Sequence, residues 1–100
     1  MKYNKLIRDK IPLLGNPQFF KSHIALEEEY QEKLYSKLEE EVQEFLESFE
    51  MEELADLLEV IHAICDLRDF DFDSLEALRL AKREEKGGFS DRIILDEYEP

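Results

Sequence analysis

The chain has 100 residues, 26 of them acidic and 13 basic, which gives a formal net charge of −13. A charge of this sign and size disfavours binding to a nucleic-acid duplex or to an anionic membrane, because both would repel it. No apolar run approaches the length of about 18 residues that a membrane span needs, and the N-terminus lacks the apolar core of a signal peptide. A single cysteine, Cys65, permits no internal disulfide, which favours a reducing, cytoplasmic location. The length predicts one domain over residues 1–100.

The first twelve residues are locally basic in this acidic chain. They form either a short helix or an extended arm. Pro12 disfavours helix at Ile11, the residue before it. A turn cluster of Gly15, Asn16 and Pro17 follows. Four cations in ten residues give the segment a potential for binding anions, although a solvated basic terminus is the alternative: Lys2, Lys5, Arg8 and Lys10.

Two helices are predicted next, from about Ala25 or Glu27 to Ser48 and from about Met51 to Leu67. Apolar residues recur in both at steps of three and four, which is the helical period. An uninterrupted helix of some forty residues would be much longer than ordinary globular helices. We therefore expect a tight turn at about residues 47–51 and an antiparallel hairpin. The first apolar stripe comprises Tyr30, Leu34, Leu38, Val42, Phe45 and Phe49, and the second Leu54, Leu57, Leu58, Ile61, Ile64 and Cys65.

A third helix is predicted after residue 73. Asp73 followed by Glu76 is a variant of the capping box, and Gly87 with Gly88 provides a stop signal. The cations near its end suit either phosphate binding or simply the negative end of the helix dipole. Beyond it, Ile93, Ile94 and Leu95 predict a strand or an extended segment.

The candidate chemistry lies in two pairs of acids, Glu41 with Glu44 and Glu53 with Asp56. Residues three apart share a helical face, so each pair presents two carboxylates beside an apolar stripe. In a hairpin these four carboxylates converge, and converging like charges repel unless a cation lies between them. Oxygen ligands suit magnesium, which keeps waters and binds substrate phosphates. The alternative is a solvated acidic face, because a glutamate-rich helix produces such spacings by chance.

The segments EEVQEF and EELADLLEVI resemble the metal-binding core of the MazG-like, all-α nucleotide pyrophosphohydrolases. YNKLIRDKIP and KREEKGGFSDRIIL are similar to a small branch of that superfamily, the phosphoribosyl-ATP pyrophosphohydrolase-like, house-cleaning nucleotide pyrophosphatases. The eight residues between Glu44 and Glu53 form a shorter spacer than typical members have, which leaves less room for a substrate-reading loop.

The resemblance implies a metal-dependent hydrolase that cleaves a nucleoside triphosphate, standard or modified, between its α and β phosphates. Glu41, Glu44, Glu53 and Asp56 would bind Mg²⁺, with Mn²⁺ as the alternative ion, and Glu40 would assist or orient water. Glu59 would extend the site, and His62 fits a packing or interface position. The residues that would hold the phosphates are Lys5, Arg8, Lys10, Lys82, Arg83, Lys86 and Arg92.

The breadth of both apolar stripes predicts a homodimer or tetramer, in which two hairpins form a four-helix bundle. The resemblance implies the same assembly. Two other classes of function stay open: an acidic helical module that binds a metal–nucleotide complex or a basic partner without hydrolysis, and a structural hairpin whose acids only keep it hydrated. The identity of the nucleotide is open as well.

Overall fold

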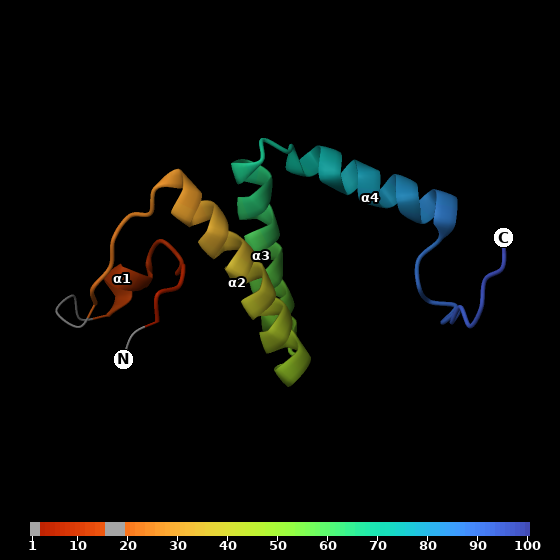
Figure 1. Ribbon diagram of the computed structural model, residues 1–100, viewed down its shortest axis with the longest axis horizontal. Helices are drawn as coiled ribbons and strands as arrows, with labels where there is room; N and C mark the ends of the chain where they lie inside the picture. The colour runs from red at the N-terminus through yellow and green to blue at the C-terminus, as the bar shows by residue number, and fades with distance from the viewer. Residues whose placement is uncertain (1–2, 16–19) are drawn as a thin grey trace. The chain divides into compact units, whose positions relative to one another are not determined.

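The computed structural model describes residues 3–15 and 20–100, which contain four helices and no strand (Figure 1). The helices are α1 (Ile11–Leu14), α2 (Glu27–Ser48), α3 (Met51–Leu67) and α4 (Phe72–Lys86). The prediction of an all-α protein is therefore confirmed. Lys2 and the expected turn residues Asn16 and Pro17 lie outside the described residues. No helix in the described part of the chain is both long and apolar enough to cross a membrane.

The chain divides into two compact units, residues 1–69 and residues 70–100. The first unit contains an N-terminal arm, which we define as residues 3–10, together with α1 and the pair α2–α3. The second contains α4 and the C-terminal tail. The arm has no regular structure, and α1 then begins at Ile11 with Pro12 in its first turn. The prediction that Pro12 disfavours helix at Ile11 is therefore wrong, because the proline lies in the first turn, where helical N–H groups have no partner within the helix.

Helices α2 and α3 pack against each other as an antiparallel hairpin (Figure 1). Their bounds agree with the predicted ones within the choice left at the start of α2. The buried apolar side chains of the described residues are Leu34, Val60 and Cys65, so the thiol serves as a small core hydrophobe. The hairpin brings the two acidic helices together through this small core.

The turn between the helices consists of Phe49 and Glu50, inside the predicted window. Phe49 adopts a left-handed conformation with φ of 58°, and its N–H donates to the Phe45 carbonyl at 2.7 Å. Its ring also meets that of Phe45 edge-to-face, with centroids 5.9 Å apart. The Ser48 hydroxyl accepts a hydrogen bond from the Glu50 N–H at 3.3 Å. These contacts stabilise a tight turn that contains neither glycine nor proline.

Large apolar side chains remain exposed along the hairpin. Phe49 is 72% exposed, and the others lie on both helices: Val42, Leu46, Met51, Leu54 and Leu58. The prediction that one chain cannot cover both stripes agrees with this exposure. In the second unit, Ile93, Ile94 and Leu95 are also exposed and form neither helix nor strand, so of the two predicted alternatives the strand is absent there.

The start of α4 differs from the prediction, because Asp71 and not Asp73 caps the helix. Asp71 has extended backbone angles, and its Oδ2 accepts hydrogen bonds from the Ser74 N–H at 3.1 Å and the Ser74 hydroxyl at 3.0 Å. Asp73 already lies inside the first turn, and Glu76 pairs with Arg79 in place of closing a capping box. The helix ends at Lys86, and Gly87 follows it as the predicted stop, with φ of 86°.

Replacing Asp71 by alanine should destabilise α4 by about 1 kcal/mol, since it removes the acceptor for the Ser74 amide. None of the residues of α4 is buried, so few other contacts compensate. Amide hydrogen exchange across Phe72–Leu78 measures the effect. Asp73→Ala is the matched control and should cost only a few tenths of a kcal/mol, about the worth of a charge near the helix dipole. Equal effects of the two substitutions would contradict the assignment of the cap.

Candidate metal centre

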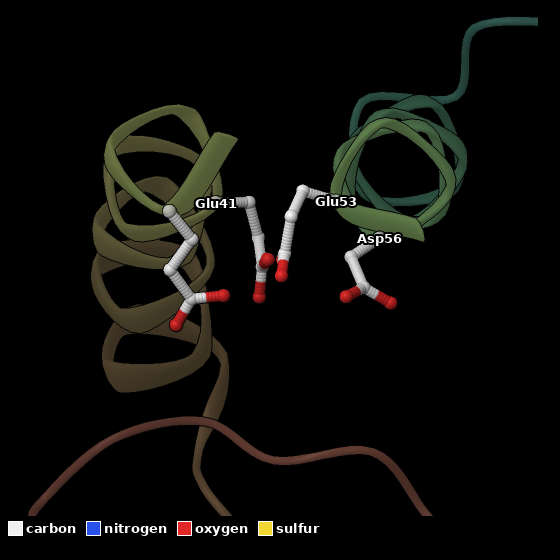
Figure 2. A group of neighbouring side chains, drawn as sticks. Glu41, Glu53 and Asp56 are labelled. Carbon is white, nitrogen blue, oxygen red and sulfur yellow. The ribbon is translucent and has the colours of Figure 1, made fainter. Parts of the chain in front are cut away.

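Four carboxylates converge at the side of the hairpin (Figure 2). Glu41 and Glu44 project from α2, and Glu53 and Asp56 from α3. Each offers one oxygen, and these oxygens all lie within 4.8 Å of one another. The structure therefore brings together the two acid pairs that the sequence places nine residues apart, counted from Glu44 to Glu53.

The short turn explains this convergence. Helix α2 ends four residues after Glu44, and α3 begins two residues before Glu53, so both acids lie in the turns nearest the connection. Glu41 and Asp56 follow one helical turn further from it, on the same faces. In an antiparallel hairpin, residues equally far from the turn lie side by side. The short connection is therefore sufficient to align the two acid pairs.

Glu41 is the most buried member of the group, with only 5% of its surface exposed. Its Oε2 is buried and has no hydrogen-bond partner among the described residues. Burial raises the pKa of the Glu41 carboxyl, and Glu44 raises it further through a hydrogen bond and its like charge. A buried carboxylate oxygen without a partner is costly, so this atom has the character of a ligand for a cation.

Glu53 is also shifted by its neighbours. Loss of solvent raises the pKa of its carboxyl first, and the negative charge of Glu44 adds to that rise. Two of the four carboxyls therefore hold their protons more tightly than isolated glutamates do. A divalent cation would remove the reason for both shifts.

The four carboxylates fit a magnesium ion in chemistry and in size. Two oxygens on opposite sides of one Mg²⁺ lie about 4.2 Å apart. The four oxygens here all lie within 4.8 Å of one another, which is close to that value. Hard carboxylate oxygens are also the ligand type that Mg²⁺ and Mn²⁺ prefer.

Glu40 does not join the group of four and pairs with two lysines instead. Its Oε1 lies 3.2 Å from Lys5 Nζ and its Oε2 lies 3.1 Å from Lys37 Nζ. Burial alone would raise the pKa of the Glu40 carboxyl, but the hydrogen bonds from Lys37 and Lys5 outweigh it and hold that pKa below its ordinary value. Lys37 also reaches Glu41 Oε1 at 3.4 Å, so Glu40 positions a cation that touches the cluster.

Sequence reasoning missed Lys37. The signal was its spacing, since it precedes Glu40 by three residues and Glu41 by four, where helical ion pairs form.

The N-terminal arm brings two of its predicted cations to these acids. Arg8 donates to Asp56 Oδ1 at 2.7 Å, and Lys5 binds Glu40 as described. Between the arm and the hairpin lies an open cleft of about 500 Å³, which Arg8, Lys10, Glu41, Asp56 and Glu59 line among others. A volume in this range accommodates a small ligand. The cleft thus adjoins both the carboxylates and the arm cations.

The remaining predicted phosphate-binding residues belong to the second unit. Lys82, Arg83 and Lys86 lie on the last turns of α4, and Arg92 follows in the tail with a positive φ of 58°. The helix dipole favours cations at this position on α4. Their phosphate-binding role stays a prediction. His62, on α3, is half-buried and takes part in an interaction, and its packing or interface role stays a prediction.

Comparison of the chain with family models, with curated proteins and with solved structures gives no match. The geometry of the carboxylates, the arm and the cleft is therefore the observation on which function is argued.

Removing the buried charge should stabilise the metal-free protein at neutral pH. Because the folded state raises the pKa of Glu41 above its ordinary value of 4.5, it binds that proton more tightly than the unfolded state does. Stability is thus lost as pH rises from about 4.5 through the raised pKa. Glu41→Gln should raise the melting temperature by a few degrees at pH 7 in chelator and much less at pH 4.

Added Mg²⁺ should then raise the melting temperature of the original chain and change that of Glu41→Gln much less. Glu39→Gln removes the same charge from an exposed position of the same helix and is the control. It should keep the original pH dependence and the original response to Mg²⁺. A Glu41→Gln protein that behaves like this control would remove the basis for a metal centre.

Proposed function

We propose that this chain is a metal-dependent nucleotide pyrophosphohydrolase of MazG-like type, which cleaves a nucleoside triphosphate between its α and β phosphates. The observation that carries the proposal is the convergence of four carboxylates, one of them with a buried and unpartnered oxygen, beside a cleft lined by arginine and lysine. Acids that hold a divalent ion, next to cations that can hold phosphates, form the pair of features that phosphoryl chemistry needs.

Each part of the site has a separate task in this proposal. Glu41, Glu44, Glu53 and Asp56 hold Mg²⁺, or Mn²⁺ in its place, and the ion supplies charge neutralisation at phosphorus and an activated water. Glu40 acts through Lys37, which it holds against Glu41. Lys10 and Arg8 line the cleft where the phosphate chain would lie. The protein contributes mainly positioning and charge stabilisation.

The assembly belongs to the same proposal. We infer that the exposed apolar side chains of α2 and α3 are covered by a second copy of the chain, so that two hairpins form a four-helix bundle. An apolar surface of this extent along one hairpin is typical of an interface. The symmetry of such a dimer gives two identical acid clusters.

Activity should appear as pyrophosphate release that depends on Mg²⁺. A panel of standard and modified nucleoside triphosphates, scored for pyrophosphate against orthophosphate, tests the reaction and the substrate together. Asp56→Asn should lower the rate by about 100-fold or more, because it removes a charged ligand with little change of shape. Glu39→Gln should keep full activity. Orthophosphate as the product, or full activity in Asp56→Asn, would contradict the proposal.

The cations of α4 should act on the substrate and not on the metal. Lys82 and Lys86 lie four residues apart and so share one helical face. Replacing both by alanine should raise KM about tenfold, equivalent to one lost phosphate contact of about 1.4 kcal/mol, with the Mg²⁺ dependence unchanged. Lys21 and Lys33, changed together to alanine, control for the loss of two charges. An unchanged KM in the first variant would mean that these lysines only stabilise the C-terminal end of α4 through the helix dipole.

A further inference from the structure

The N-terminal arm is attached to the hairpin by contacts that a bound metal would disturb. Arg8 donates to Asp56 Oδ1 at 2.7 Å, and Asp56 is one of the four converging carboxylates. The guanidinium thus supplies positive charge to the group in the absence of an ion. Lys5, the other arm cation with an ion pair, binds Glu40 and leaves the four carboxylates untouched.

A divalent ion and Arg8 compete for the same charge. An Mg²⁺ bound by Asp56 would lie about 2.1 Å from a carboxylate oxygen, so it would approach the Arg8 nitrogen to within roughly 5 Å. Two cations at this distance repel each other. The Arg8–Asp56 pair is itself easily broken, because both side chains are well exposed and exposed ion pairs are weak.

Little else prevents the arm from moving. Residues 3–10 form no helix or strand, and their described contacts to α2 and α3 run through side chains. Leu6 and Ile7 are half-buried and act as the anchor, whereas Arg8 lies on the exposed side. The guanidinium can therefore leave Asp56 while the anchor stays in place, and it then faces the cleft of about 500 Å³ that it already lines.

We infer that Arg8 exchanges partners: it pairs with Asp56 while the site lacks a metal, is displaced when a divalent cation binds, and then binds the phosphate groups of the ligand. Guanidinium suits the second role because it pairs with phosphate through two parallel hydrogen bonds. The exchange links the two halves of the site, since displacement by the metal makes Arg8 more available to phosphate. This inference rests on the proposed function for the identity of the ligand, but its metal step does not require hydrolysis.

Calorimetric titration of Mg²⁺ tests the first step. Arg8→Gln should bind Mg²⁺ about three- to tenfold more tightly than the original chain, because it removes the competitor. Lys5→Gln removes an equal charge from the same arm, but its partner is Glu40, so it should change the affinity by less than twofold. An equal gain in both variants would mean that Arg8 acts only through the net charge of the arm, which would contradict the inference. A loss of affinity for Mg²⁺ in Arg8→Gln would contradict it as well.

Hydrogen exchange of residues 5–11 tests the movement itself. The Ile11 N–H donates to the Arg8 carbonyl at 3.1 Å and reports on the end of the arm. Mg²⁺ alone should speed exchange in this segment, and Mg²⁺ with inorganic pyrophosphate should slow it again, but only when Arg8 is present. Binding of Mg²⁺ without a change in exchange would overturn the inference and leave the proposed function standing. Absence of Mg²⁺ binding would overturn both.

Discussion

The central constraint on this protein is the repulsion among four carboxylates that hydrophobic packing brings together. Two unit charges 4 Å apart repel by about 4 kcal/mol at an effective dielectric constant of about 20. Burying a leucine side chain contributes about 1.5–3 kcal/mol. The hairpin has a small core around Leu34, Val60 and Cys65, so full ionisation of the cluster would oppose a large part of the packing that creates it.

The surrounding residues answer this constraint in two ways. Glu41 and Glu53 have raised pKa values, so protons can reduce the charge. Lys37 and Arg8 bring positive charge to Glu41 and Asp56, respectively. Neither measure satisfies the buried Oε2 of Glu41. A divalent cation would satisfy that atom and neutralise its neighbours at once, and this is the reason for proposing a metal centre here.

Helical periodicity was sufficient to predict most of the fold. The bounds of α2 and α3 follow from their apolar spacing, and the implausible length of a single helix required the turn near Ser48. The four carboxylates could be predicted for the same reason, since their positions depend only on two helical faces and a short connection. Gly87 follows the end of α4 as expected, because a glycine, which has no side chain, adopts a positive φ at little cost.

What could not be predicted depended on contacts between distant or competing residues. Asp71 and Asp73 are equivalent as capping residues in the sequence, and only the backbone angles at Asp71 decide between them. The partner of Arg8 lies 48 residues away, so no local pattern indicates that it binds Asp56. The pairing of Lys37 with Glu40 and Glu41 could have been predicted from their spacings of three and four residues. The phosphate-binding role of the cations on α4 requires knowledge of the ligand.

A crystal grown with Mn²⁺ tests the account most directly, because anomalous scattering locates that ion without reference to activity. We expect an anomalous peak about 2.1–2.3 Å from oxygens of both helices, including Glu41 Oε2, with the Arg8 guanidinium moved away from Asp56. A crystal that contains Mn²⁺ elsewhere, or none between the four carboxylates at a saturating concentration, would contradict the assignment of the metal centre.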